Sequence, residues 1–488
     1  MRDWLAAAAD ARPEGIALLA PGRSWTFAEL QADASALAAR LRAAGVRAGD
    51  RIAVLLPNGV DYVRLIHALA RLGAVLVPLN LRLTPAELRW PLTRTGAGLL
   101  LHNEETAAAA QSLADLARPL ALDALAAYPA DPDDWCERPL DLEAAQAIIF
   151  TSGTSGVPKG AVLTFGNHFY GAMASAYRIG VLPHDRWLAP LPLYHVGGLA
   201  VVLRSCLYTT TVVLPPTHDA AAISRALDAQ AVTLVSLVPT MLGRLLDQRA
   251  DQPPPPHLRL VLLGGAAAAP ELLARADAAG WPVATTYGLT EAASQVATMT
   301  PEDVRAKPGS VGKPLLLTRV RIADADGRDL PAGQYGEIVV SGPTVMRGYL
   351  DEPDARALRA GELYTGDIGY VDADGDLWPV QRRSDLIVSG GENIYPTEVE
   401  AALRAHPDVL DVCVVGAPSE EWGQQVAAAV VLRPGAALSA DELTGFARAS
   451  LAGYKLPRMI RFVEALPQTA SGKIQRAAVA ALFEQPKA

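Results

Sequence analysis

The segment from Ile148 to Gly160 concentrates side chains that could bind or activate a ligand. It reads Ile-Ile-Phe-Thr-Ser-Gly-Thr-Ser-Gly-Val-Pro-Lys-Gly, an apolar strand pattern followed by hydroxyls, glycines and one lysine. Glycines let successive backbone amides turn toward an anion, while hydroxyls and a lysine add donors and charge. We predict that this loop binds phosphate through the following residues: Thr151, Ser152, Gly153, Thr154, Ser155, Gly156 and Lys159.

The spacing excludes two better-known loops. Counting from Gly153, the second glycine of a Walker A loop is replaced by Pro158, and Gly160 stands where that loop has Ser or Thr. A nucleophile elbow of the G-x-S-x-G type is excluded because Ser155 is followed directly by Gly156. For the loop taken alone, a flexible polar turn remains the alternative.

Further segments along the chain carry residue types suited to catalysis. They are Leu191–Gly198 (LPLYHVGG), Tyr287–Glu291 (YGLTE), Tyr364–Asp367 (YTGD), Arg382–Asp385 (RRSD) with Ser389–Asn393 (SGGEN), and Ser471–Lys473 (SGK). Singly, His195 could be a core histidine, Asp367 a turn residue and Lys473 a solvated lysine. Together with the phosphate loop and in this order, the segments resemble the adenylate-forming superfamily, which includes acyl-CoA synthetases, peptide-synthetase adenylation domains and luciferases. The resemblance covers nearly the whole chain.

The resemblance implies that a carboxylate attacks the α-phosphorus of ATP and that the acyl-adenylate then reacts with coenzyme A. Two anions meet in the first step, so positive charge must offset their repulsion, and Mg²⁺ and a lysine can supply it. By resemblance, Glu291 holds Mg²⁺ and Lys473 bridges the acid and the α-phosphate. The nucleotide-binding residues that it implies, besides those of the phosphate loop, are Tyr287, Gly288, Thr290, Asp367 and Arg382.

The second step also draws its residues from the resemblance. His195 would lie beside the acid and the entering thiol, and the Gly390-Gly391 loop would line the channel for the pantetheine of coenzyme A. Ser384 stands where many acyl-CoA synthetases carry an aspartate, at the pivot of a mobile C-terminal domain. A serine keeps the hinge, since a hinge needs only to absorb backbone rotation.

A finer resemblance concerns the acid. The segments Thr164–His168 and Asp185–Trp187, together with Ser384, resemble those of the 2-succinylbenzoate–CoA ligases of menaquinone synthesis. That resemblance implies 2-succinylbenzoate as substrate and 2-succinylbenzoyl-CoA, AMP and diphosphate as products. Most of these segments shape the fold rather than contact the acid, so the inference from them is associational. Two alternatives stay open: another acyl- or aryl-CoA ligase acting on a fatty or benzoic acid, and a nucleotide-binding regulator without catalysis.

Arg204 offers a physical reason to prefer a dicarboxylate. It lies nine residues after His195 in an otherwise apolar stretch, where it could pair with the carboxylate that is not activated. The alternative is an arginine that reaches the surface or pairs with a nearby aspartate. Ser294 and Gln295, just after Glu291, are further polar candidates for the acid pocket.

The elements that position these residues follow an α/β pattern. Arg51–Leu56 and Ala74–Pro78 read as buried strands around a helix at Tyr62–Leu72, so we expect parallel sheets covered by helices. From about residue 310 short strands such as Thr318–Ile322 and Glu337–Val340 predict a β-rich subdomain. We therefore predict an N-terminal AMP-binding domain over 1–382, with the β-rich part at about 310–382, and a small mobile α+β domain over 383–488.

Four capping boxes mark helix starts in this reading. Each has a hydroxyl residue followed three positions later by glutamate, and the hydroxyl residues are Thr26, Thr84, Thr397 and Ser439. In the C-terminal domain, strands are expected at Val409–Val415 and Val426–Leu432.

Composition limits the class of protein. The chain has 488 residues, 50% hydrophobic and 19% charged, with a net charge of −9, which argues against nucleic acid as a partner. Three cysteines without CxxC spacing predict neither a disulfide framework nor a zinc site. Asp3 and Asp10 interrupt the apolar start, and no long apolar run follows, so we expect a cytoplasmic protein without a membrane span. Its partners would be small molecules, and a homo-oligomer is left open.

Overall fold

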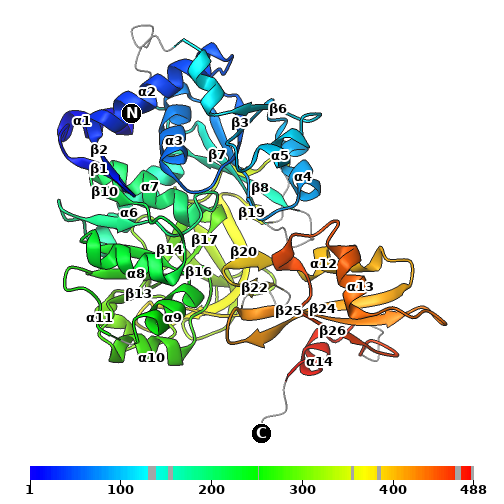
Figure 1. Cartoon of the computed structure of the whole chain (residues 1–488). Helices are drawn as coiled ribbons and strands as arrows, with labels where there is room; N and C mark the ends of the chain where they lie inside the picture. The colour runs from blue at the N-terminus through cyan, green and yellow to red at the C-terminus, as the bar shows by residue number, and fades with distance from the viewer. Residues whose placement is uncertain are drawn as a thin grey trace. The chain divides into compact units, whose positions relative to one another are not determined.

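The computed structural model describes residues 1–129, 139–151, 158–250, 252–352, 357–381, 386–467 and 474–484 (Figure 1). The chain divides into two compact units. The larger contains Met1–Asn80, Pro91–Phe150 and Gly160–Val380, and the smaller contains Leu81–Trp90, Thr151–Lys159 and Gln381–Ala488. The boundary predicted at 382/383 falls within the segment 382–385, which lies outside the described residues.

A seven-stranded sheet holds the strands on either side of the phosphate-loop segment. Its order is β18-β8-β7-β4-β3-β5-β6, and β3 pairs in parallel with β4 and β5. β3, β4 and β5 are short runs of mostly apolar, buried residues, as parallel strands covered on both faces require. The bounds of the seven strands are β3 Arg51–Leu55, β4 Val75–Pro78, β5 Leu99–His102, β6 Arg118–Ala121, β7 Ala145–Thr151, β8 Lys159–Thr164 and β18 Gly348–Tyr349.

A nine-stranded sheet forms the second layer of the larger unit, in the order β15-β14-β13-β12-β11-β9-β10-β1-β2. Its central strands run parallel, and β13 and β14 form an antiparallel pair near one edge. The bounds are β1 Ile16–Ala20, β2 Arg23–Thr26, β9 Arg186–Leu188, β10 Thr211–Val213, β11 Leu234–Leu237, β12 Leu260–Leu263, β13 Val283–Leu289, β14 Ser294–Thr298 and β15 Lys313–Pro314.

Helices separate and cover these sheets, so the expected α/β class is confirmed (Figure 1). One continuous core joins α2, α3, α6 and α7 to strands of both sheets. The helices of the larger unit, with α4 shared between the two, are α1 Trp4–Ala11, α2 Phe27–Ala43, α3 Val60–Leu72, α4 Pro85–Thr95, α5 Ala107–Gln111, α6 Phe165–Ile179, α7 Val196–Tyr208, α8 Ala220–Ala229, α9 Pro239–Gln248, α10 Pro270–Ala278 and α11 Pro301–Val304.

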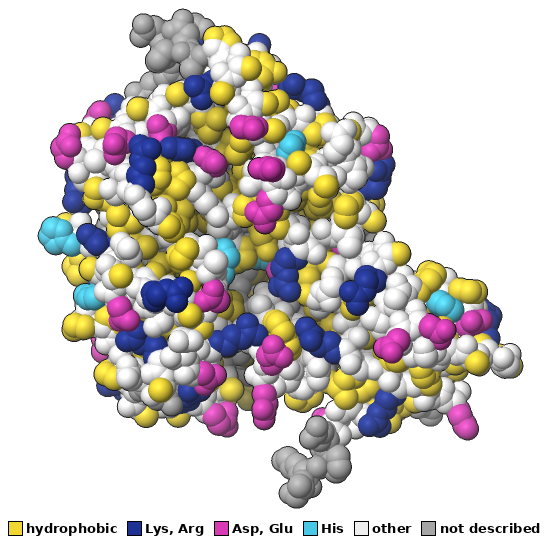
Figure 2. Space-filling view, viewed as in Figure 1, with side chains coloured by type: hydrophobic (Ala, Val, Ile, Leu, Met, Phe, Trp, Pro, Cys, Tyr) yellow, Lys and Arg dark blue, Asp and Glu magenta, His cyan; other side chains and the backbone are white. Residues whose placement is uncertain are grey.

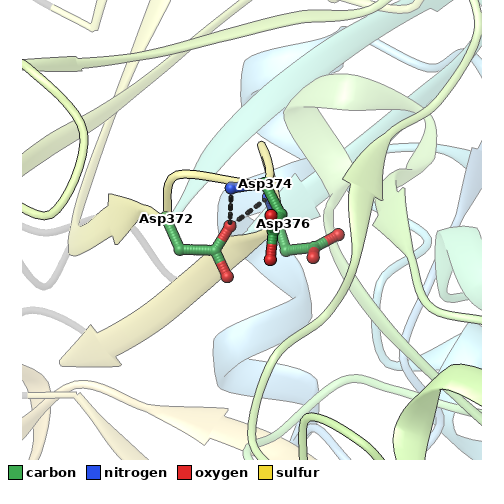
Figure 3. A group of neighbouring side chains, drawn as sticks. All are labelled: Asp372, Asp374 and Asp376. Carbon is green, nitrogen blue, oxygen red and sulfur yellow. Dashed lines mark hydrogen bonds between the residues drawn. The ribbon is translucent and has the colours of Figure 1, made fainter.

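A five-stranded sheet forms the predicted β-rich region. The strands are β16 Arg319–Ala323, β17 Gly336–Ser341, β19 Leu358–Arg359, β20 Glu362–Val371 and β21 Leu377–Gln381. The turn between β20 and β21 carries Asp372, Asp374 and Asp376, whose carboxylates converge (Figure 3). Lys307 Nζ donates to all three at 2.8, 2.7 and 2.5 Å. This ammonium and that of Lys313, which is 3.2 Å from Asp376 Oδ1, offset part of the negative charge of the cluster and join the segment after α11 to the sheet.

The smaller unit contains an α+β fold built on a long antiparallel pair. β24 (Val409–Ser419) pairs with β25 (Gly423–Leu432), and α12 (Pro396–Arg404) and α13 (Ala440–Ala447) share its core. The remaining elements are β22 Ile387–Ser389, β23 Glu392–Ile394, β26 Met459–Phe462 and α14 Arg476–Ala481.

Three of the four predicted capping boxes are confirmed, at Thr26, Thr84 and Ser439. The box at Thr397 is wrong, because α12 begins at Pro396 with Tyr395 as its N-cap. Proline suits the first helical position, where no intrahelical bond needs its missing N–H. The Glu400 carboxylate accepts a hydrogen bond from Val414 N on β24 at 2.8 Å. It also forms an ion pair with Arg476, the first residue of α14.

Two surface properties bear on the predicted partners. Among the described residues, no helix combines the length and apolar character needed to cross a bilayer. On the face shown in Figure 2, acidic and basic side chains are interspersed.

Candidate active site

A hydrogen bond joins the YGLTE motif to the YTGD motif, both predicted to bind the nucleotide. Tyr287 lies on β13 and Asp367 on β20, and the tyrosine hydroxyl donates to Asp367 Oδ2 at 2.7 Å. The aspartate is half-buried, and its own amide donates to Thr365 Oγ1 at 3.1 Å. A carboxylate held in this way keeps lone pairs for other donors, such as the hydroxyls of a ribose.

The turn between β13 and β14 is tight and needs its glycine. A Cβ on Gly288 would stand 1.7 Å from the carbonyl oxygen of Ser294, which no larger residue could avoid. Ala293 and Ser294 adopt φ values of 52° and 98°, a region that side chains rarely occupy. The turn thereby places Thr290 and Glu291, both half-buried, in a short 3₁₀ segment directly after β13.

Glu291 is fixed from two sides. Tyr349 donates its hydroxyl to Glu291 Oε1 at 2.7 Å, and Met346 N donates to the Glu291 carbonyl at 2.8 Å. Tyr349 lies on β18, which pairs with β8 just after the phosphate-loop segment. A half-buried carboxylate fits Mg²⁺, which prefers oxygen ligands and is often held by one or two carboxylates together with substrate phosphates.

His195 ends a loop that is clamped by an asparagine. Asn58 Nδ2 donates to Leu191 O at 2.8 Å, and Asn58 Oδ1 accepts from Leu193 N at 2.8 Å. A Cβ on Gly198 would stand 2.2 Å from Pro192 O, so the first turn of α7 packs directly on this loop. His195 is the N-cap residue of α7, with its ring 4.7 Å from that of Tyr194.

Arg204 lies farther along α7 and is buried, with 3% of its surface exposed. The alternative of a surface arginine is therefore wrong, and no carboxylate among the described residues forms an ion pair with it. Burial lowers the pKa of its guanidinium from the usual range. A buried cation without an anion is costly, so this position is suited to an anionic ligand.

The other acid-pocket candidates lie on β14, which packs against both α6 and α7. Gln295 is buried, its Nε2 donates to Thr298 Oγ1 at 2.9 Å, and its Oε1 has no partner among the described residues. Ser294 is half-buried.

The smaller unit presents the Gly390-Gly391 turn between β22 and β23. The φ values of 58° and 88° make this a two-residue hairpin that favours glycine at both positions. A Cβ on Gly390 would stand 2.7 Å from the Trp422 ring, so the loop lies flat on that indole.

Several predicted residues cannot be placed. Thr151 ends β7 and Lys159 begins β8, but the loop between them and two later motifs lie outside the described residues; the residues concerned are Ser152, Gly153, Thr154, Ser155, Gly156, Arg382, Ser384 and Lys473. Three residues near these motifs were not predicted as site residues from the sequence: Asn58, Tyr349 and the buried His168, on which the charge of Arg204 acts. For Asn58 and Tyr349 the sequence signal is a polar residue near a strand or helix end, which many positions share; His168 ends the segment Thr164–His168, which was noted only as part of a family resemblance.

Comparisons with known proteins give the same class as this site. A family model described as AMP-binding enzyme matches residues 5–350, and one for the C-terminal domain of AMP-binding enzymes matches residues 398–473. The chain belongs to this family of adenylate-forming enzymes.

Within the family, the chain is similar to enzymes named as ligases of 2-succinylbenzoate and coenzyme A. It is 43% identical to the 2-succinylbenzoate–CoA ligase of Geobacillus kaustophilus over 98% of this chain and 96% of that one. It is 38% identical to a double mutant of o-succinylbenzoate CoA synthetase from Bacillus subtilis bound with its product analogue OSB-NCoA, with TM-score 0.92 over 98% and 97% of the two chains. The same synthetase in complex with ATP and magnesium ion gives 38% identity and TM-score 0.76 over 98% and 99%.

Proposed function

We propose that this chain joins 2-succinylbenzoate to coenzyme A, the reaction for which its curated relatives are named, and that ATP is cleaved to AMP and diphosphate. Arg204 is the observation that carries the choice of acid. It is a buried cation without a carboxylate partner among the described residues, on the helix that His195 caps. A monocarboxylic acid would leave this charge unpaired, whereas a dicarboxylate can pair with it.

In the first step, an oxygen of the aliphatic carboxylate attacks the α-phosphorus, and diphosphate leaves. Asp367, oriented by Tyr287, holds the ribose together with Arg382, and Thr151, Thr290 and Lys159 contact the phosphates. Glu291, held by Tyr349, binds the magnesium ion, which supplies positive charge at the phosphates. The ammonium of Lys473 supplies further positive charge, next to the oxygens of the attacking carboxylate and of the α-phosphate.

In the acid pocket, the ring carboxylate lies at Arg204 while the aliphatic carboxylate reaches the nucleotide. His195 forms the wall at the end near the reacting carbonyl, in a loop that Asn58 keeps in place. Ser294 and Gln295 provide polar contacts from β14. The pocket thereby fixes which of the two carboxylates is activated.

In the second step, the thiol sulfur of coenzyme A attacks the acyl carbon, and AMP leaves as the thiol gives up its proton. The Gly390-Gly391 turn lines the pantetheine channel, and the lack of a side chain at Gly390 lets the turn pack on the Trp422 ring. Because Lys473 is needed for the first step only, the C-terminal domain pivots at Ser384 between the steps.

One assay tests the proposed function. The chain is incubated with ATP, Mg²⁺, coenzyme A and either 2-succinylbenzoate, benzoate or a fatty acid, and thioester, AMP and diphosphate are quantified. We expect the highest kcat/KM for 2-succinylbenzoate. A higher value for benzoate or a fatty acid would assign the chain to another acyl- or aryl-CoA ligase. If no acid supports thioester formation or the exchange of diphosphate into ATP, the chain is a nucleotide-binding regulator without catalysis.

The cytoplasm remains the compartment we propose for this reaction, because ATP and coenzyme A are both available there. The absence of a CxxC pair agrees with a reducing environment.

A further inference from the structure

His168 on α6 and Arg204 on α7 are buried polar side chains, close enough for the charge of Arg204 to act on the imidazole. The two helices pack on each other, and the two side chains are 4% and 3% exposed. His168 Nε2 has no hydrogen-bond partner among the described residues. A buried cation that forms no ion pair with a carboxylate among the described residues, next to a histidine nitrogen without a hydrogen-bond partner there, indicates a place where a ligand supplies the missing partner.

The same face of α6 packs closely on the turn between β13 and β14. Gly171 follows His168 by three residues and therefore lies on the same side of the helix. A Cβ at Gly171 would meet only Ala293 O at 3.6 Å and Thr344 Cγ2 at 3.9 Å, and Thr344 Oγ1 is also without a partner. This glycine brings α6 next to the turn that carries the acid-pocket candidates of β14.

The charge state of His168 suits an anion. Burial first, and the charge of Arg204 second, lower the pKa of His168 to about 3. The imidazole is therefore neutral at physiological pH and carries one N–H donor and one acceptor nitrogen. In the tautomer with the proton on Nε2, the free donor is the one without a protein partner.

We propose that His168 is a specificity-determining residue that donates from Nε2 to the ring carboxylate paired with Arg204. This assignment rests on the proposed function, because it needs an acid with a second carboxylate. The two helices then bind that carboxylate from both sides: α7 supplies the compensating charge, and α6 supplies a directional hydrogen bond without adding a second buried charge.

The test compares His168→Leu with His168→Gln, whose amide nitrogen can replace the Nε2 donor. Each variant is assayed with 2-succinylbenzoate and with 4-oxo-4-phenylbutanoate, which lacks the ring carboxylate. We expect His168→Leu to lower kcat/KM for the dicarboxylate roughly ten- to hundred-fold and to change that for the analogue little. His168→Gln should recover most of the loss, and the KM for ATP should stay constant.

His67 offers a matched control, since it is a buried histidine on α3, 6% exposed, whose pKa is likewise lowered by burial, to about 4. His67→Leu should not separate the two acids. Equal losses with both acids in His168→Leu, or no loss with either, would overturn the role of His168. If His168→Leu does not fold, His168→Phe, which keeps a ring but cannot donate, takes its place: a loss confined to the dicarboxylate supports the role, and equal changes with both acids overturn it.

Binding provides a second measurement that does not depend on turnover. We expect 2-succinylbenzoate to raise the Tm of the parent more than that of His168→Leu, and the analogue to raise both equally. An equal rise with 2-succinylbenzoate would overturn the proposal. If the parent itself forms thioester from another acid and none from 2-succinylbenzoate, the proposed function fails, and this result is distinct from any effect of the variants.

Discussion

Arg204 on α7 places a positive charge in the protein interior. Its removal is the most direct test of which acid the chain activates. Truncating one partner of a buried charge pair costs about 2–5 kcal/mol, or roughly 30-fold to several-thousand-fold. We predict a loss of this size in kcat/KM for 2-succinylbenzoate in Arg204→Ala, measured by thioester formation. The KM for ATP should barely change, because the nucleotide residues lie on other elements.

The analogue without the ring carboxylate is the control for Arg204. It should be a poor substrate for the parent and lose little more in the variant. A packing defect would instead weaken both acids alike. If the variant handles both acids as the parent does, the second carboxylate is recognised by other groups.

Lys473 should matter in one half-reaction only. A positioned charge at a centre where negative charge develops is typically worth roughly 10²–10³ in rate. We therefore predict that Lys473→Ala slows acyl-adenylate formation by at least that factor, measured by exchange of diphosphate into ATP. Preformed acyl-adenylate should still react with coenzyme A at close to the parent rate. Equal loss in both half-reactions would contradict the role assigned to this lysine.

At the scale of single elements, the β13–β14 turn connects backbone geometry with magnesium binding. In Gly288→Ala the new Cβ would overlap Ser294 O, and an overpacked site of this kind commonly costs about 1–3 kcal/mol. We predict a lower Tm and a higher concentration of Mg²⁺ for half-maximal activity, because Glu291 follows the glycine in this turn. Gly243→Ala on α9, where the nearest atom is 3.9 Å away, is the matched control and should change neither.

The acidic turn after β20 should give a pH-dependent contribution to stability. Burial raises the pKa of Asp372, but hydrogen bonds from Lys307 and Trp378 outweigh it and hold that pKa well below the usual range. A depressed folded-state pKa stabilises fully above the unfolded value of about 3.9, and the stabilisation is lost as the pH falls below it. We predict that Lys307→Met lowers the free energy of unfolding at pH 7, and that the gap to the parent narrows at pH 3.

Urea denaturation at the two pH values measures this gap. Arg328→Met is a suitable control, because its ion pair with Asp326 is exposed on both sides and should contribute little at either pH. A gap of equal size at pH 7 and pH 3 would mean that Lys307 acts through packing rather than through the three carboxylates.

Over the whole molecule, local patterns were readable from the sequence and long-range contacts were not. The capping boxes at Thr26, Thr84 and Ser439 join residues three positions apart, so spacing alone predicts them. Asn58 and Leu191 are 133 positions apart, and only the fold reveals their hydrogen bond. The failure at Thr397 shows a limit even nearby, because Pro396 competes for the helix start.

Among the site residues, some could be assigned from sequence motifs, whereas their contacts could not. Tyr287 and Asp367 could each be assigned from a motif, yet their contact depends on how β13 and β20 are brought together. Arg204 could be suspected from its apolar neighbours, whereas His168 gains significance only when α6 packs on α7. The motifs predict the reaction, and the tertiary packing reveals further residues that position the motifs or are proposed to bind the acid.

The last prediction concerns the two arrangements that two half-reactions require of one set of residues. Lys473 must reach the α-phosphate first, and coenzyme A must later approach the same carbonyl, so the C-terminal domain has to turn between the steps. Proline fixes φ near −65° and restricts the residue before it, so Ser384→Pro should hinder rotation at the hinge. We predict that this variant retains part of the exchange of diphosphate into ATP and loses most of its thioester formation.

Ser384→Ala separates rotation from the loss of the hydroxyl, because alanine leaves φ free, and it should perform both half-reactions nearly as the parent does. The two half-reactions are measured separately, by diphosphate exchange and by single-turnover release of AMP from the acyl-adenylate on addition of coenzyme A. If Ser384→Pro forms thioester at the parent rate, the chain pivots at another residue. If it loses both half-reactions together, the substitution has disturbed the nucleotide site through its neighbour Arg382, and the two-arrangement scheme loses its support at this position.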